Sequence, residues 1–212
     1  MLSLAVFLGN PGTEYARHRH NAGRLLAEKL PFYGDLAWHK KFRSRLAHTV
    51  SGGDLQSPCH FLVPETYMNL SGLSVQAAAA FHRIPPQKIL VVHDELELPL
   101  GYLSLKFAGG LGGHNGLRSI KDSLGTAEFW RLRIGIGRPP GGRAPGEGGG
   151  EAKGVYAGGD GKIARWVLSS FNSDEAAILE TVLKAGASLL IRAMTEDPET
   201  LLAEWKKKRV SC

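Results

Sequence analysis

Asparagine and aspartate side chains stand in this sequence where alternating strands and helices usually carry an active site. Asn10 directly follows one apolar run, Asp94 ends a second, and Asn115 opens an amphipathic segment typical of a helix. In open α/β sheets, the turns beyond the carboxyl ends of the strands form the ligand-binding edge. The positions of these three residues therefore predict an active site at that edge.

His20 is the residue best suited to act as a base. It lies in the run His18-Arg19-His20-Asn21-Ala22-Gly23, just before an apolar helical segment. A histidine can take a proton from water, an aspartate can fix its tautomer, and amides can hold a carbonyl or an oxyanion. Together these side chains are typical of water activation near a carbonyl group.

Plainer interpretations of the same residues remain open from the sequence. Asn10-Pro11-Gly12 could be a tight turn, His20 a helix cap or core residue, and His93-Asp94-Glu95 solvated charge at the end of a strand. A metal hydrolase is a weaker alternative, which would use the four histidines His18, His20, His93 and His114. No cluster of Cys and His supports it, so we expect no metal and no cofactor.

The glycines are concentrated in one part of the chain. Nineteen of the 27 lie between Gly101 and Gly161. The run from Gly109 to Gly116 has the composition of a phosphate-binding loop but lacks the lysine of a P-loop, so a flexible lid is an equal interpretation. Residues 139–161 hold ten glycines and three prolines and are typical of a loop insertion. The G-x-S-x-G elbow of many serine hydrolases is missing from the sequence.

Composition limits the class of protein. The 212 residues are 43% hydrophobic and 22% charged, the balance of a soluble, globular domain. Lys and Arg number 26 against 20 Asp and Glu, which is consistent with a polyanionic partner and equally with a generic basic enzyme. The two cysteines form no disulfide framework, and no apolar run approaches the roughly 18 residues of a membrane span. We therefore expect a cytoplasmic protein without a membrane partner.

Predicted strands and helices alternate along the chain, which predicts an α/β fold. We expect a three-layer sandwich, in which a central mixed, mostly parallel twisted sheet is flanked by helices. Residues 1–212 are expected to form a single domain, with the insertion at about 139–161 as a loop, and to act as a monomer. Strands are expected at 4–8, 43–50, 60–63, 89–92, 102–107 and 131–137, and helices at 21–30, 74–81, 115–124, 173–194 with an interruption at Gly186, and 198–207.

Five segments resemble the signature blocks of bacterial peptidyl-tRNA hydrolase and occur in the family's order. They read FLGNPGTEY at 7–15, RHNAG at 19–23, ETYMNLSG at 65–72, VHDELELP at 92–99 and GGHNGL at 112–117. The residues from 167 onward resemble the family's C-terminal helices. The resemblance implies hydrolysis of the ester between a peptide and the 3′-terminal ribose of tRNA, which recycles the tRNA. An ester has a good leaving group, so an activated water suffices for this reaction.

The resemblance also implies roles for individual residues. His20 matches the family's catalytic histidine, and Asp94 matches the carboxylate that orients it. Three amides match those that place the peptide and the water: Asn10, Asn69 and Asn115. Matches to residues that support the site, bind substrate or line its channel are Tyr15, Asn21, Tyr67, Met68 and His114. Lys106 and Arg133 match a basic pair that holds the 5′-phosphate at the acceptor end of the tRNA.

The chain departs from the family pattern at a few positions. His18 stands where Thr is common, while Ala108 and Leu111 replace Gly and His in the glycine-rich run. The segment 139–161 is longer than the corresponding family loop. The main alternative function is an RNA-binding protein on the same scaffold that does not hydrolyse the ester. The retained histidine, aspartate and asparagines favour catalysis.

Overall fold

The structure is a computed structural model that describes residues 1–49, 58–140 and 161–210. Within these residues, eight strands form one sheet in the order β2-β3-β4-β1-β5-β7-β6-β8. The strands are β1 (Leu4–Phe7), β2 (His39–Lys41), β3 (Ser44–His48), β4 (His60–Pro64), β5 (Ile89–Glu95), β6 (Tyr102–Phe107), β7 (Trp130–Gly135) and β8 (Lys208–Arg209). The α-helices described with them are α1 (Ala22–Ala27), α2 (Ser71–His82), α3 (Asn115–Leu124), α4 (Gly161–Val167), α5 (Ser173–Thr195) and α6 (Pro198–Trp205).

The centre of the sheet is parallel and its two sides are antiparallel. Strands β4, β1, β5 and β7 run parallel, and Val6 of β1 pairs with Leu62 on one side and Val91 on the other. The pairs β2–β3, β3–β4, β7–β6 and β6–β8 are antiparallel. The strands expected at 43–50 and 60–63 are β3 and β4, which pair as neighbours. This mixed sheet with a parallel centre confirms the predicted fold class.

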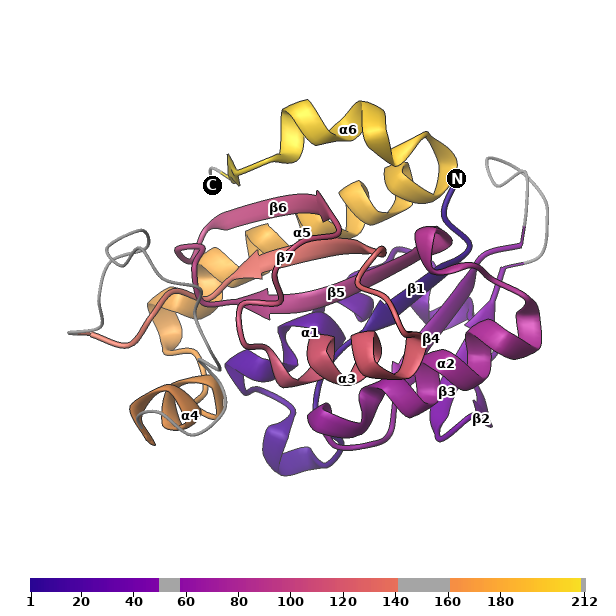
Figure 1. Cartoon of the computed structure of the whole chain (residues 1–212). Helices are drawn as coiled ribbons and strands as arrows, with labels where there is room; N and C mark the ends of the chain where they lie inside the picture. Colours follow the sequence, from indigo (N-terminus) through magenta and orange to yellow (C-terminus); the bar gives the residue numbers. More distant parts are fainter. Residues whose placement is uncertain (50–57, 141–160, 211–212) are drawn as a thin grey trace.

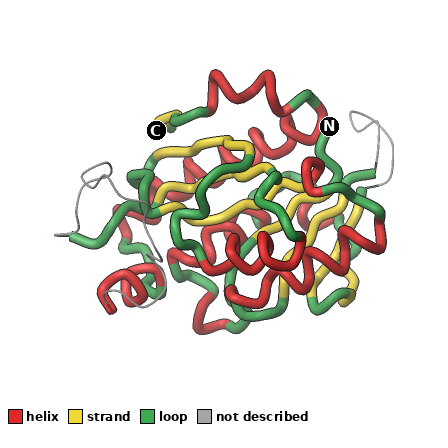
Figure 2. The backbone as a smooth tube through the Cα atoms, viewed as in Figure 1, coloured by secondary structure: helices red, strands yellow, loops and turns green. Residues whose placement is uncertain are grey.

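Helices cover both faces of the sheet and give the fold three layers, with strands crossing the middle of the molecule (Figures 1 and 2). β1 and β5 are buried along their full length, and strands buried on both faces read as continuous apolar runs. Phe7 and Val92 belong to the core shared with α1 and α5, and Val6 and Val91 to the core shared with α2 and α3.

The start of α1 lies directly on the central strands. A Cβ atom at Gly23 would lie 2.5 Å from the carbonyl oxygen of Val92 and 2.7 Å from that of Leu8. Only glycine, which has no side chain, permits this approach of helix to sheet. As a result, the turn before α1, which carries His20, reaches the carboxyl ends of β1 and β5.

Several element boundaries differ from those predicted. The helix expected at 21–30 is a 3₁₀ turn, Arg19–Asn21, followed by the short α1. β5 continues through the triplet His93-Asp94-Glu95, which is buried, so the interpretation of that triplet as solvated charge was wrong. The interruption expected at Gly186 was also wrong, because α5 is continuous there. A Cβ atom at Gly186 would lie 2.6 Å from Leu26, so this glycine allows α5 to pack closely on α1.

Among the strands and α-helices of the described residues, β2, α4 and β8 were not predicted. The two strands have three and two residues, too few to show a periodic pattern. α4 begins at Gly161, which the sequence had placed in the insertion, while residues 141–160 of that insertion lie outside the described residues. No helix in the described ranges is long and apolar enough to cross a membrane.

Candidate active site

The five residues expected to carry the chemistry come from loops and ends at the carboxyl edge of the parallel strands. Asn10 follows β1, and Asn69 lies in the 3₁₀ turn Met68–Leu70 after β4. Asp94 is near the end of β5, and Asn115 is the first residue of α3. A pocket of about 300 Å³ is lined by Asn10, His20, Tyr67, Met68, Asn69, Asn115, Ala164, Val167 and Leu168. Segments far apart in the sequence therefore meet around one cavity.

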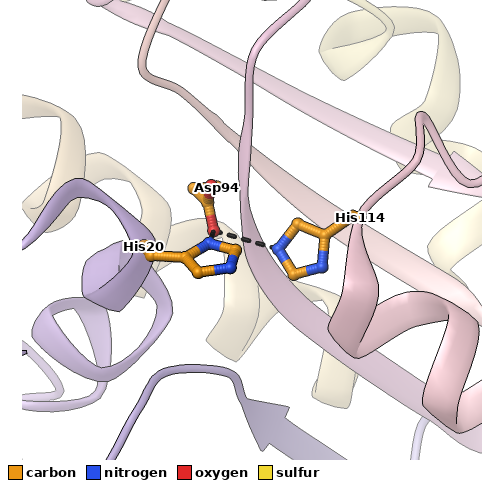
Figure 3. Close-up of side chains that lie close together, drawn as sticks. All are labelled: His20, Asp94 and His114. Atoms are coloured by element: carbon orange, nitrogen blue, oxygen red, sulfur yellow. Dashed lines mark hydrogen bonds and ion pairs between the residues drawn. The ribbon is translucent and has the colours of Figure 1, made fainter. Parts of the chain in front are cut away.

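Asp94 lies between two histidines, which point toward it from the turn before α1 and from the start of α3 (Figure 3). Nδ1 of His20 is 2.9 Å from Oδ1 of Asp94, and Nε2 of His114 is 3.0 Å from the same oxygen. All three side chains are almost completely buried. The carboxylate can therefore accept a hydrogen bond from each ring.

The tautomer of His114 follows from its place as the N-cap of α3. Its Nδ1 accepts hydrogen bonds from the backbone N–H groups of Gly116 and Leu117, at 3.1 and 3.3 Å. An accepting Nδ1 carries no proton, so Nε2 must carry one and donate it to Asp94. His114 is thus a neutral donor that holds the same carboxylate oxygen as His20, with the two ring centroids 4.9 Å apart.

Asp94 is ionised despite its burial. Burial alone would raise the pKa of Asp94, but its interactions with His20 and His114 outweigh burial and hold the pKa well below its usual range. An ionised Asp94 accepts the Nδ1–H of His20. The proton acceptor for a water would then be Nε2 of His20.

His93 lies behind this group and is kept neutral. Its Nδ1 donates to the backbone carbonyl of Asp94 at 2.7 Å, and its ring centroid lies 5.0 Å from that of His114. Burial, and then the neighbouring His114, lower the pKa of His93 well below its ordinary value. His93 therefore supports the ring of His114 without adding charge to the site.

Asn10 and Asn21 hold each other through two hydrogen bonds. The Asn10 backbone N–H donates to Oδ1 of Asn21 at 2.9 Å, and Nδ2 of Asn21 donates to the Asn10 carbonyl at 3.0 Å. Oδ1 of Asn10 accepts from the backbone N–H of Met68 at 2.8 Å. Because its oxygen binds the chain at Met68, Asn10 can offer a substrate the NH₂ half of its amide, which is a donor.

A family model described as peptidyl-tRNA hydrolase matches residues 4–211. The chain belongs to the peptidyl-tRNA hydrolase family. A curated peptidyl-tRNA hydrolase from Treponema pallidum is 46% identical over 212 residues, covering 99% of this chain and 96% of the relative. One from Desulfitobacterium hafniense is 42% identical, covering 92% and 91%. The resemblance found in the sequence is thereby confirmed.

The fold agrees with a solved member of the peptidyl-tRNA hydrolase family. The crystal structure of peptidyl-tRNA hydrolase from Acinetobacter baumannii superimposes with a TM-score of 0.80 at 32% sequence identity. The match covers 97% of this chain and 94% of that one. The similarity therefore extends over the helices and strands on both sides of residues 141–160.

Three ligand atoms at the centre of this family site are close enough to raise the question of a metal. One atom each from His20, Asp94 and His114 lies within 4.8 Å of the others. Of the other histidines in the metal alternative, His18 instead packs edge-on against Tyr15, with ring centroids 5.4 Å apart. The same arrangement is equally explained without a metal, because His20 and His114 each lie within hydrogen-bond distance of Oδ1 of Asp94.

Lys106 and Arg133 lie together but away from the pocket. With Ser104, Leu105, Phe107, Leu202, Ala203 and Lys206 they line a separate hollow of about 500 Å³. Nε and Nη2 of Arg133 each lie 2.9 Å from Oε2 of Glu95. Burial lowers the pKa of Lys106, and Arg133 and Arg131 lower it further, while Glu95 opposes them. The two basic residues thus line one hollow. A carboxylate that the sequence did not indicate, that of Glu95, is paired with Arg133.

Asp94 and Glu95 are consecutive residues of β5, but their side chains have different partners. Side chains of successive strand residues point to opposite faces of a sheet. Accordingly, Asp94 contacts His20 near α1, whereas Glu95 contacts Arg133 of the neighbouring strand β7. One strand therefore supplies a carboxylate to each of the two sites.

Arg131 holds the beginning of the glycine-rich run. Its buried guanidinium donates to the carbonyl oxygens of Ala108, Gly109 and Gly110. Ala108 has φ 51°, a left-handed conformation that costs an L-residue other than glycine roughly 1–2 kcal/mol. Alanine at this position therefore carries local backbone strain, next to carbonyls that Arg131 binds.

One wall of the pocket was not predicted from the sequence, and the expected place of Tyr15 in a substrate channel stays a prediction. Ala164, Val167 and Leu168 line the pocket from α4 and the residue after it, and no motif marks them. Tyr15 lies on the turn Thr13–Tyr15 and is not among the residues that line the pocket. Asn21 and His114 contribute as supports of Asn10 and Asp94.

Proposed function

We propose that this chain hydrolyses the ester between a peptide and the 3′-terminal ribose of tRNA, with His20 as the base that activates the attacking water. Peptidyl-tRNA hydrolysis is the activity that the family model, the curated relatives and the fold support. The observation that carries the assignment of His20 is its 2.9 Å contact with a buried, ionised Asp94 at the edge of a pocket lined by three asparagines.

The residues around the pocket account for each proton of the reaction. Nε2 of His20 takes a proton from water while the water oxygen attacks the ester carbonyl carbon. Asp94 stabilises the imidazolium that forms. When the carbon–oxygen bond to the ribose breaks, the ribose oxygen takes that proton, and the products are the free peptide and the tRNA.

Asn10, Asn69 and Asn115 are the donors proposed for the carbonyl oxygen as it becomes an oxyanion. Each lines the pocket, and a well-placed donor of this kind contributes about 2.7–4 kcal/mol to the transition state. Amides that bind the backbone of the peptide read no side-chain sequence. That suits an enzyme whose substrates carry many different peptides.

Release of the acetylated amino acid from an N-acetylated aminoacyl-tRNA tests this function directly. The purified protein should release it, and His20→Ala should lower the rate by about 10²- to 10⁴-fold, the usual contribution of a general base. The matched control is His48→Ala, because His48 is exposed and lies outside the pocket.

The same assay separates the alternatives. Near wild-type turnover by His20→Ala would contradict the role of His20, and no turnover by the wild type would favour an RNA-binding protein without activity. Binding of tRNA by His20→Ala should remain nearly intact. Full activity in EDTA is expected, and loss of activity that Zn²⁺ restores would instead support the metal alternative.

We propose that the hollow with Lys106 and Arg133 receives the 5′-phosphate of the tRNA. The two cations lie in one hollow, and phosphate contacts supply affinity that depends on salt without reading bases. Arg133→Ala should weaken tRNA binding and reduce the slope of log K against log salt by about one. Arg138→Ala is the control, since Arg138 also pairs with a glutamate, Glu97, but lies outside the hollow. An equal change in both variants would count against the phosphate site.

We propose further that residues 1–212 act as a single domain and as a monomer. The family match on both sides of the segment 139–161 supports one domain with a loop insertion. An enzyme whose substrate is tRNA would work in the cytoplasm. Light scattering of the purified chain checks the monomer, because a dimer would double the measured mass.

A further inference from the structure

Arg19, the residue before His20, links the two sides of the pocket. Its side chain is buried although it carries a charge. The guanidinium carbon lies 3.7 Å from the ring centroid of Trp166 and 4.6 Å from that of Phe171. Nη2 lies 2.6 Å from Oε2 of Glu175. Arg19 therefore leaves the turn that carries the catalytic histidine and ends among residues of α4, of α5 and of the segment between them.

The backbone strengthens the same connection. The N–H of Arg19 donates to the carbonyl of Ser169 at 2.9 Å, and Nε donates to Oγ of Ser169 at 3.2 Å. His18 and Ser170 form an isolated antiparallel bridge. The chain that follows α4 is thus fastened to residues 18 and 19.

α4 needs such an anchor because it has little core of its own. Of its described residues, Gly161–Val167, only Val167 is fully buried. Helices of a few turns depend on tertiary contacts for their stability in water. Trp166, which packs partly buried against the main core, also has the Arg19 guanidinium on its ring face and donates a hydrogen bond from Nε1 to the carbonyl of Gly137 at 2.8 Å.

We infer that Arg19 is a positioning residue, which holds α4 as the apolar wall of the pocket against the bound peptidyl group. Ala164, Val167 and Leu168 form that wall, and His20 and the asparagines line the same pocket. The inference rests on the function proposed above, because it takes the pocket to be where the peptidyl group binds. It assigns to Arg19 no contact with the reacting atoms.

The chemistry of the site favours arginine over lysine. A planar guanidinium can stack on two rings and keep a hydrogen-bonded ion pair in its plane, whereas an ammonium group is a compact point charge. Burial raises the pKa of Glu175, but the hydrogen bonds from Arg19 and from the Asn172 backbone outweigh it and keep that pKa below its ordinary value. The ion pair therefore persists at neutral pH.

Kinetics of Arg19→Met with N-acetylated aminoacyl-tRNA test the inference. KM should rise about tenfold while kcat stays within about twofold, because the His20–Asp94 pair remains and only binding by the wall is lost. Arg19→Lys should fall between the wild type and Arg19→Met. Arg192→Met is the matched control, because Arg192 pairs with Glu196 and Glu204 outside the pocket, and its KM should not change.

Amide hydrogen exchange supplies a second readout. Exchange in residues 161–168 should be faster in Arg19→Met than in the wild type, with strands β1 and β5 unchanged. Trp166→Leu removes the same contact from the side of α4, so it should reproduce both the raised KM and the faster exchange. This second variant keeps the test valid if Arg19→Met does not fold.

The outcomes distinguish this inference from the proposed function. Unchanged KM and unchanged exchange in a folded Arg19→Met or Trp166→Leu, with His20→Ala inactive, would overturn the role of Arg19 alone. A fall in kcat with KM unchanged would also overturn it, because Arg19 would then act on His20 and not on the wall. Activity in His20→Ala would overturn the proposed base and leave the anchoring of α4 to be decided by hydrogen exchange.

Discussion

Two groups of histidines lie near opposite ends of the parallel strands, and only one of them surrounds a carboxylate. His20, His93 and His114 gather around Asp94, toward the carboxyl end of β5. The second group is made of His48, His60 and His82, with the rings of His60 and His82 4.0 Å apart at the amino end of β4. Within the described residues, no carboxylate pairs with this second group.

The difference lies in the carboxylate and not in the histidines. Burial, followed by the repulsion of His82 and His48, lowers the pKa of His60 to about 4. Burial, then Lys41 and His48, likewise lower the pKa of His82. In the first group, the ionised Asp94 fixes a ring and can stabilise its charge. A group of histidines is thus suited to accept a proton from water where a carboxylate is built in beside it.

Without the negative charge of Asp94, the histidines around it should lose most of their ability to accept a proton from water, as we expect of the group His48, His60 and His82. Asp94→Asn should lower kcat about 10²-fold, the low end of the contribution of a general base and less than His20→Ala, because the base remains but loses its orientation and its countercharge. Steady-state release of acetylated amino acid measures this effect. Glu97→Gln, which alters an acidic residue paired with Arg138 at the same edge, should leave kcat unchanged. An Asp94→Asn enzyme of wild-type kcat would show that the carboxylate does not decide the difference.

The second group should affect stability in acid and not activity. The folded pKa of His60, about 4, lies below its ordinary value of 6.5, so protonation favours the unfolded chain. Its contribution to the free energy of unfolding is complete above pH 6.5 and is lost as the pH falls from 6.5 toward 4. His60→Gln should therefore lose less stability than the wild type between pH 7.5 and 4.5, in urea unfolding. His39→Gln, in which an exposed histidine of β2 is replaced, should match the wild type.

The activity of His60→Gln at neutral pH tests the other half of this prediction, that the second group does not take part in the reaction. His60→Gln should retain wild-type release of the acetylated amino acid, since His60 lies at the amino end of β4 and the pocket at the carboxyl ends. Equal loss of stability in His60→Gln and the wild type would show that His60 is not the titrating group. A loss of activity would link the two ends of the sheet.

Local patterns in the sequence account for the catalytic edge. The apolar runs of β1 and β5 mark buried parallel strands, and the rule for α/β sheets then places Asn10 and Asp94 at one edge. The family motifs add His20 and His114. The capping role of His114 depends only on the backbone groups two and three residues later, so it too is a local property.

Contacts between distant segments could not be predicted in the same way. His60 and His82 are 22 positions apart and meet only because β4 and α2 pack together. α4 follows a long glycine-rich stretch, and its wall residues are small or aliphatic without a motif of their own. Glu95 was visible beside Asp94, but its contact with Arg133 depends on the register of β5 and β7, which pairs His93 with Arg133.

Asp94 and Glu95 occupy neighbouring positions of β5, so a change in the length of this strand affects both proposed sites at once. Deleting or inserting one residue in this strand would exchange the faces on which they stand. Glu95 would then turn toward His20, and Asp94 toward Arg133. Substitutions can adjust either site alone, but a change in the length of β5 alters the hydrolytic centre and the phosphate site in a single event. We therefore expect relatives of this enzyme to differ in the segment 141–160 and to keep the length of β5 constant.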